Sequence, residues 1–330
     1  VVATTALVVG CGAGTIGTAV SSSRATTTTS VSAALASATS TTSTTTPGTA
    51  TAPESTTTAV DGSTAPSAVA VAGECITVTF TPSTASVAQL AELCTPSGDV
   101  EDTAIVLVHG GAGVSGSRTD LTAWQDWYAE QGYVTLSVDY ALVDPDTDTG
   151  IYPLAVRNVK AGVRYLRRVG ASLGVDSIVI QGNSAGARLA GIVATTGDDA
   201  SFSGDELWPG VSDAVDGTVG FYGYYDGAQF NGAAYFGGDG APASTASAID
   251  NAASVSGWTI LVHGTADSIV GVTASEDYAA ALESVGAEVR LVEIDGAEHG
   301  LDGYDTAELT AVGRQLARMI VSTIRANSSA

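Results

Sequence analysis

The segment Ser177–Ala190 limits the fold of this chain more than any other, because it predicts a strand, a sharp turn and a helix in succession. Residues 178–180 are Ile-Val-Ile, which suits a fully buried strand and is too short for a buried helix. Gly-Asn-Ser-Ala-Gly follows at 182–186, and then come helix-favouring residues. Such a turn would hold Ser184 with its hydroxyl exposed at the sheet edge, as a nucleophile requires. The alternative is an incidental serine in a glycine-rich turn.

The N-terminal twenty residues are predicted to be the remnant of an export signal. They begin with an apolar run, without an initiator Met or a basic region, and the run is too short to span a membrane. Val8-Val-Gly-Cys11 resembles the bacterial lipobox, in which the cysteine is lipidated and becomes the new N-terminus. The alternative is an ordinary signal peptide cleaved after Ala36-Ser-Ala38. Either route predicts an exported protein, held in the cell envelope as a lipoprotein or secreted.

Residues 21–68 are predicted to be a disordered linker, because they consist almost wholly of Ser, Thr, Ala, Pro and Gly. Such a segment cannot bury enough apolar area to offset the entropy of ordering its backbone. Residues 69–330 fit a single large α/β domain with its own core.

Net charge restricts the partners of the chain. It carries 35 acidic against 12 basic residues, a formal charge of −23 at pH 7. This field repels nucleic acid and anionic membrane surfaces. We therefore expect no nucleic-acid partner and no membrane contact except through an N-terminal lipid anchor at Cys11. The acidity itself is interpreted as solvation of the surface.

Short apolar strands alternate with amphipathic helices along the domain, which predicts a mostly parallel central sheet with helices on both faces. In such a sheet, catalytic loops lie at the carboxyl ends of the strands. The predicted strands are 76–80, 104–108, 133–140, the run before the turn at Ser184, 218–222, 258–262 and 288–294; the predicted helices are 119–131, 154–173, the one after Ser184, 275–285 and 306–324.

Two cysteines, Cys75 and Cys94, remain as an even pair if Cys11 is consumed by lipidation. A disulfide between them suits an exported protein and, for so short a loop, would contribute about 3 kcal/mol in the chain-entropy model. Two unpaired buried thiols are the alternative.

Four motifs occur in an order that resembles the α/β-hydrolase superfamily: HGGAG at 109–113, GNSAG at 182–186, HGTAD at 263–267 and GAEHG at 296–300. The resemblance covers about residues 100–326. It is strongest to the esterase/lipase branch with a His-Gly-Gly oxyanion motif, which includes hormone-sensitive-lipase-like carboxylesterases and related carbohydrate esterases. It implies an α/β-hydrolase fold and a serine hydrolase that cleaves carboxylic esters.

The chain departs from the family pattern at three positions. Asn183 stands where Asp or Gly is frequent, Ala112 where a third Gly is common, and Ala141 where an Arg often follows Asp-Tyr. These positions bear on the sub-family and not on the chemistry.

A serine hydroxyl needs a neighbouring base, and only three histidines are available. His109 ends a strand before the Gly-Gly loop, where we expect its ring to brace that loop. His263 ends a core strand and is expected to be a structural histidine. His299 lies in a glycine-flanked loop after the last strand, free to reach Ser184, and is the predicted base.

Asp267 is the predicted carboxylate that orients His299, because it follows the penultimate strand in the chain order Ser, Asp, His. Asp295 and Glu298 are rivals, but they are too close in sequence to His299 to orient its ring.

The backbone amides of Gly110, Gly111 and Ala185 are the predicted oxyanion hole. No pattern of metal ligands is present, so no metal and no cofactor is expected.

The irregular stretches 197–215 and 226–250 are small insertions, which favour an open site and small-molecule or saccharide ester substrates with short acyl groups. Aromatic residues cluster after the turn at Ser184 and are interpreted as core or as pocket lining: Phe221, Tyr222, Tyr224, Tyr225, Phe230, Tyr235 and Phe236. A peptidase or lactone hydrolase on the same scaffold, and a non-catalytic envelope binding protein, stay open as alternatives.

Overall fold

The computed structural model describes residues 71–81, 89–144, 152–199, 202, 207–208, 210–227, 244–301 and 311–328, with the backbone of short strands at 6–8, 17–19 and 57–61. Cys11, Phe230, Tyr235 and Phe236 lie outside these residues, so the predictions for them stay predictions. Among the described helices, none is long and apolar enough to cross a membrane.

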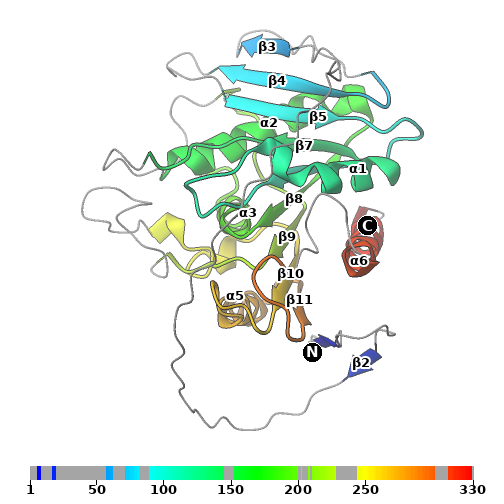
Figure 1. Cartoon of the computed structure of the whole chain (residues 1–330). Helices are drawn as coiled ribbons and strands as arrows, with labels where there is room; N and C mark the ends of the chain where they lie inside the picture. The colour runs from blue at the N-terminus through cyan, green and yellow to red at the C-terminus, as the bar shows by residue number, and fades with distance from the viewer. Residues whose placement is uncertain are drawn as a thin grey trace, which may run out of the picture.

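One mixed sheet forms the centre of the molecule (Figure 1), in the strand order β2-β1-β11-β10-β9-β8-β6-β7-β5-β4-β3. Neighbouring strands run parallel from β11 through β7, whereas β5 is antiparallel to both β7 and β4. The mostly parallel sheet predicted from the alternation of strands and helices is therefore confirmed. The strands are β1 (Ala6–Val8), β2 (Gly17–Ala19), β3 (Thr57–Asp61), β4 (Cys75–Thr81), β5 (Gln89–Cys94), β6 (Thr103–Val108), β7 (Val134–Val138), β8 (Ser177–Asn183), β9 (Gly217–Phe221), β10 (Trp258–Gly264) and β11 (Val289–Ile294).

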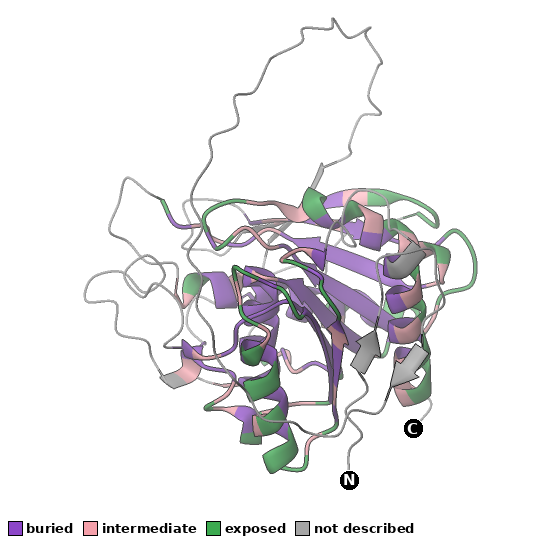
Figure 2. Ribbon diagram, turned by 60° about the horizontal axis from the view of Figure 1, so that its bottom comes forward, coloured by how far each residue is buried: buried purple, intermediate pink, exposed green. Residues whose placement is uncertain are grey.

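Helices cover both faces of the sheet, and the alternation of side chains along β6 shows why. Val106 and Val108 join one core cluster with helix α2 (Leu154–Leu173) and helix α3 (Ala185–Thr195). Ile105 and Leu107 point to the other face and join a cluster with helix α1 (Thr122–Glu130) and helix α6 (Ala311–Ser328). Every residue of β6 is buried, as a central strand covered on both faces requires. Figure 2 shows the strands almost entirely buried and the helices exposed on their outer sides.

A third apolar cluster seats helix α5 (Thr273–Ser284) beside β10 and β11. Leu261 and Leu291 supply the sheet side of this contact, and Tyr278 and Leu282 supply the helix side. Since Ile260 and Val262 join the opposite cluster, period-two alternation again assigns neighbouring residues to different faces.

Most predicted elements match the structure to within a few residues, and helix α2 has the predicted bounds. The predicted helix 119–131 divides into a 3-10 turn, Arg118–Leu121, and α1. Strand β5 was not predicted at all. Its first residue, Gln89, is polar yet buried, because its side-chain amide donates to the carbonyls of Asp139 and Asn158 at 2.9 and 2.7 Å. Short alternation that includes buried polar residues is hard to detect in sequence.

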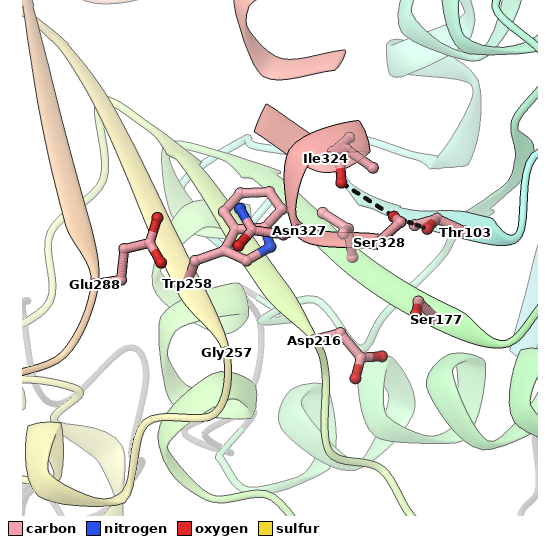
Figure 3. A pocket seen from close by; sticks show the side chains of 10 residues that line it. Thr103, Ser177, Asp216, Gly257, Trp258, Glu288, Ile324, Asn327 and Ser328 are labelled. Carbon is pink, nitrogen blue, oxygen red and sulfur yellow. Dashed lines mark hydrogen bonds between the residues drawn. The ribbon is translucent and has the colours of Figure 1, made fainter. Parts of the chain in front are cut away.

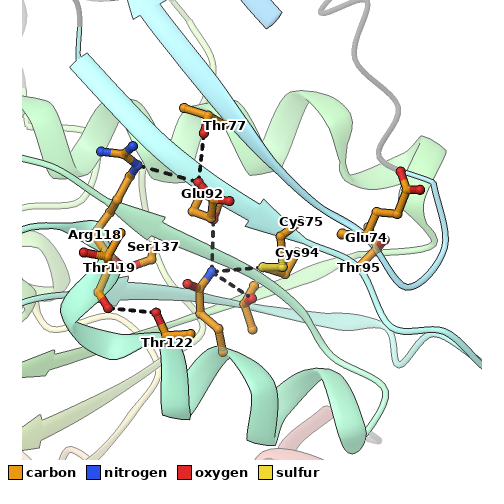
Figure 4. The surroundings of a disulfide bond; sticks show 12 residues. Glu74, Cys75, Thr77, Glu92, Cys94, Thr95, Arg118, Thr119, Thr122 and Ser137 are labelled. Carbon is orange, nitrogen blue, oxygen red and sulfur yellow. Dashed lines mark hydrogen bonds and ion pairs between the residues drawn. A yellow bond between two sulfur atoms is a disulfide. The ribbon is translucent and has the colours of Figure 1, made fainter. Parts of the chain in front are cut away.

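The disulfide joins β4 to β5. Cys75 and Cys94 are opposite each other in the antiparallel register, with Cα atoms 4.0 Å apart and sulfur atoms 2.02 Å apart. Figure 4 shows the surroundings of Cys75 and Cys94. The amide of Gln125 on α1 approaches Cys94 Sγ at 3.4 Å. Strand β3, parallel to β4, lies inside the range predicted as linker.

Candidate active site

Ser184 lies at the apex of the turn between β8 and α3, with φ 52° and ψ −115°. A non-glycine residue with such a positive φ is strained, and strain of this kind gathers at functional sites. Its neighbours explain how the turn is possible. A Cβ on Gly182 would come within 2.2 Å of the Gly186 carbonyl oxygen, and a Cβ on Gly186 within 2.1 Å of the Val108 carbonyl oxygen. Glycine at both positions lets strand and helix approach this closely.

His299 and Asp267 complete a chain of hydrogen bonds that begins at Ser184. His299 Nε2 lies 3.0 Å from Ser184 Oγ, and His299 Nδ1 lies 2.7 Å from Asp267 Oδ2. The other carboxylate oxygen, Oδ1, accepts the backbone N–H groups of Ile269 and Val270 at 2.9 and 2.8 Å. The structure thus brings together the three residues that the sequence predicted as nucleophile, base and orienting acid.

Electrostatics keep Asp267 ionised. Burial alone would raise the pKa of its carboxyl, but the backbone N–H of Val270, the ring of His299 and the N–H of Ile269 outweigh burial and hold the pKa below its ordinary value. The Asp267 side chain is fully shielded, whereas His299 keeps 17% of its side chain exposed. A buried anion beside a partly exposed imidazole suits a ring that must take up and release a proton.

The loops that carry Asp267 and His299 are tied to each other. The N–H of Ala266 donates to the Ala297 carbonyl at 3.0 Å. Ser268 donates to the Glu298 carboxylate twice, through its N–H at 3.0 Å and through its hydroxyl at 2.9 Å. Glu298 therefore clamps the two loops together. Asp295, the other rival acid, has an exposed contact with Thr265 at 3.4 Å.

The Gly110–Gly111 loop packs against the turn at Ser184. A Cβ on Gly110 would lie 3.0 Å from the Asn183 carbonyl oxygen and 3.4 Å from Ser184 Cβ, so the loop backbone reaches the nucleophile's position. Gly111 has φ +101°, which glycine adopts readily. No hydrogen bond between described residues uses the N–H of Gly111 or of Ala185. Both amides are thus available to a ligand oxygen.

His109 braces this loop. Its Nδ1 lies 2.8 Å from the Gly110 carbonyl oxygen, and its ring stacks on Tyr140 with centroids 4.2 Å apart. The Tyr140 hydroxyl donates to the carbonyls of His109 and Gly110 at 2.9 and 3.1 Å. Burial lowers the pKa of His109 and so favours the neutral ring.

The sequence did not indicate how close His263 would lie to Asp267. The ring is fully buried, and its Nε2 lies 3.2 Å from Asp267 Oδ2 and 2.8 Å from the Val270 carbonyl oxygen. Its Nδ1 lies 2.7 Å from the hydroxyl of Ser275 on α5. The spacing of His263 and Asp267, four residues apart, was the only available indication, and it does not fix a contact across the end of a strand.

Tyr222 packs directly against His299, with ring centroids 4.7 Å apart in an edge-to-face arrangement. Its own φ is 39°, a second strained non-glycine residue beside the site. The remaining described aromatics of the predicted cluster, Phe221, Tyr224 and Tyr225, are buried, as core residues are.

A cavity of about 320 Å³ lies at the amino ends of the strands, and Ser184 is not among the residues that line it (Figure 3). It is lined by residues at the starts of strands, including Thr103, Ser177 and Trp258, and by Ser328 of α6. The hydroxyls of Thr103 and Ser328 already bond each other at 2.7 Å. Among the described residues, no group of three or more His, Cys, Asp or Glu is placed to hold a metal ion.

This arrangement can support proton transfer from a hydroxyl to an imidazole. A serine oxygen bonded to a ring nitrogen loses its proton as it attacks an electrophilic carbon, and the carboxylate stabilises the imidazolium that forms. Amides at the N-terminus of α3 and in the Gly-Gly loop can stabilise a developing oxyanion.

Residues 93–282 match the sequence model of the BD-FAE family. Esterase 2 of Thermogutta terrifontis, phosphoramylated by tabun, has TM-score 0.62 and 23% identity, over 72% of this chain and 90% of that chain. The butyrate-bound form of a thermophilic esterase from the same organism has TM-score 0.62 and 22% identity, over 73% and 91%. A truncated carbohydrate esterase from gut microbiota has TM-score 0.58 and 17% identity, over 73% and 91%. These likenesses confirm the α/β-hydrolase fold. No curated protein sequence matches the chain.

Proposed function

The chain belongs to the BD-FAE family, an α/β-hydrolase-like esterase family, and on this basis we propose that it is a serine hydrolase of carboxylic esters. The observation that carries the proposal is the unbroken chain of hydrogen bonds from Ser184 Oγ through His299 to Asp267.

In the proposed mechanism, Ser184 Oγ attacks the ester carbonyl while His299 Nε2 accepts its proton. Asp267 holds Nδ1 protonated and stabilises the imidazolium. The amides of Gly110, Gly111 and Ala185 stabilise the tetrahedral oxyanion. His299 then protonates the departing alcohol, which leaves an acyl-enzyme on Ser184. Water attacks this ester with His299 as base, and the acid is released as Ser184 regains its proton.

The proposed substrates are esters of short acyl groups, including acetylated saccharides. Two comparisons support this class of substrate. The thermophilic Thermogutta esterase has a butyrate-bound structure, and the similar protein from gut microbiota is a carbohydrate esterase. The organophosphorus adduct of the Thermogutta esterase supports a reactive nucleophile on this scaffold.

The test is covalent labelling with a fluorophosphonate, together with hydrolysis of p-nitrophenyl esters of increasing chain length and of acetylated xylo-oligosaccharides. Ser184→Ala should abolish labelling and lower turnover by several orders of magnitude. Ser172→Ala, on α2 and bonded only to the Val169 carbonyl among described residues, is the matched control and should behave as wild type. Labelling of Ser184→Ala would refute the nucleophile. Preference for aminoacyl nitroanilides or lactones would favour the alternative hydrolase classes.

We also propose that the protein is exported, with Cys11 as the site of lipidation. The lipobox-like Val8–Cys11 and the Cys75–Cys94 disulfide support this, because disulfides persist in oxidising compartments. Metabolic labelling with a fatty-acid probe should mark the wild type and not Cys11→Ser. An unlabelled wild type that is found in the medium would favour the secreted form.

A further inference from the structure

We propose that His263 is a positioning residue of this site: its buried, protonated Nε2 lies against Asp267 Oδ2 and so helps to hold the carboxylate against His299. The inference rests on the proposed function, since it assigns a role within the same hydrogen-bonded chain.

Hydrogen-bond geometry fixes where the proton of His263 lies. The Val270 carbonyl oxygen, 2.8 Å from Nε2, can only accept, so Nε2 must carry the proton. In the neutral ring Nδ1 is then an acceptor, and the Ser275 hydroxyl at 2.7 Å donates to it. Burial favours this neutral form. The Nε2–H is hydrogen-bonded to the Val270 carbonyl, and Asp267 Oδ2 lies 3.2 Å from the same nitrogen as a second, longer contact.

With this donor in place, both oxygens of Asp267 are held from two sides. Oδ1 accepts two backbone N–H groups, and Oδ2 lies 2.7 Å from His299 Nδ1 and 3.2 Å from His263 Nε2. Two imidazoles therefore share one carboxylate oxygen, and the second imidazole is itself anchored to α5 through Ser275. A carboxylate so restrained cannot rotate away when Ser184 transfers its proton.

Loss of the His263 donor should change catalysis in two measurable ways. Asp267 Oδ2 would keep only its bond to His299, so the carboxylate would be held less firmly. The imidazole of His299 would then be less well oriented, and kcat should fall. The negative charge of Asp267, no longer shared with His263, would act on His299 alone and favour its protonated form. In a plot of kcat/KM against pH, the fall on the acid side (the acid limb) should therefore move to higher pH, while KM stays close to the wild-type value.

Two other ionisable groups lie near His263 and need a control. Glu293 is its register partner on β11, and burial together with the nearby carboxyl of Glu276 on α5 raises the pKa of Glu293. Neither carboxyl bonds Asp267 among the described residues. Glu293→Gln removes a half-buried carboxyl from the neighbouring strand and should leave both kcat and the acid side of the pH profile near wild type.

The experiment compares kcat and the pH profile of kcat/KM for the wild type, His263→Leu, His263→Gln and Glu293→Gln. For each protein the concentration of active sites is determined by fluorophosphonate titration, and kcat is calculated from it. His263→Leu should lower kcat about 10- to 100-fold, the loss expected for one hydrogen bond to a charged group, and shift the acid limb upward. His263→Gln keeps an amide N–H donor and should recover part of both effects. A Leu variant that loses stability but keeps the wild-type kcat and acid limb would reduce His263 to a structural role.

A measurement on the unmodified protein guards against a variant that does not fold. In ¹⁵N-histidine NMR spectra, His263 should be neutral and protonated at Nε2 across the active pH range; protonation at Nδ1 would overturn the proposal. Failure of the proposed function is recognised separately, because the wild type itself would then neither take up the fluorophosphonate nor hydrolyse esters.

Discussion

Lys160 Nζ lies 2.7 Å from Asp213 Oδ1, and both side chains are sealed from solvent. The second carboxylate oxygen of Asp213 pairs with Arg164, one turn farther along α2, so a single buried anion serves two cations. Lys160 also donates to the Thr196 carbonyl at 2.5 Å. This cluster fastens α2 to the segment that precedes β9.

The two partners should differ sharply in their effect on stability. Asp213→Asn leaves two buried cations facing each other and should cost about 3–5 kcal/mol of the free energy of unfolding. Lys160→Met should cost clearly less, because Asp213 keeps Arg164 and the methionine fills the apolar space. Guanidinium unfolding curves measure the free energy of unfolding of both variants. Equal losses in the two variants would contradict the description of one buried anion that serves two cations.

The turn at Ser184 should not tolerate a methyl group on Gly186. Its Cβ would lie 2.1 Å from a backbone oxygen of β6, so Gly186→Ala must push α3 away from the sheet. We expect a loss of roughly 1–3 kcal/mol, typical of overpacking, together with reduced ester hydrolysis. Gly98→Ala, which has nothing within 4 Å of the added atom, is the control and should be nearly neutral. Wild-type stability and activity in Gly186→Ala would show that the contact is looser than described.

The Cys75–Cys94 disulfide should raise the melting temperature. The bond spans 19 residues and should contribute about 3 kcal/mol, which for a domain of this size corresponds to roughly 6–12 °C. Reduction should lower the Tm of the wild type by this amount, and the Tm of a Cys75→Ser/Cys94→Ser variant should not respond to reductant. Free thiols in a non-reduced peptide map of native protein would contradict the pairing.

Two buried histidines should make the fold sensitive to mild acid. Burial lowers the pKa of His109 and of His263 below the ordinary value of 6.5. Between the folded and unfolded pKa values the unfolded chain binds more protons, so stability must fall as the pH drops below about 6.5. Urea unfolding from pH 8 to 5 should show this slope, and His109→Gln should reduce it. A free energy of unfolding that is constant across this range would exclude the effect.

Substitutions should show whether Asp267 or Asp295, one of its two rivals, is the acid that orients His299. Asp267→Asn should keep the fold and lower turnover by something on the order of 10⁴, because the amide no longer selects the correct tautomer of His299. Asp295→Asn should retain near-wild-type turnover, since its contact with Thr265 is exposed and long. If ester hydrolysis assays showed loss of turnover in Asp295→Asn and not in Asp267→Asn, the orienting acid would lie in the loop after β11.

The sequence allowed the parallel sheet, the turn at Ser184 and helix α2 to be predicted because each has a local cause. Apolar runs specify buried strands, small residues specify the turn, and Gly174 with φ +77° ends α2. The contact of Asp267 with His299 needs β10 and β11 side by side, and the chain order of the motifs still predicted it. The contact of Asp267 with His263 escaped prediction, because a spacing of four residues across the end of β10 does not fix it. Strand β5 escaped prediction because its buried Gln89 is satisfied by carbonyls 50 and 69 residues away. Such long-range compensation has no local sign.

Ser184 and His299 are 115 residues apart in the chain, and their hydrogen bond depends on β9, β10 and β11 being in register between them. During synthesis the serine leaves the ribosome long before its partner exists, and α6 emerges later still. No N-terminal fragment that stops short of His299 can hold the reactive pair, so a nascent chain of that length cannot act on esters through it. In refolding, recovery of hydrolysis should accordingly be among the last events, later than the return of helical circular dichroism.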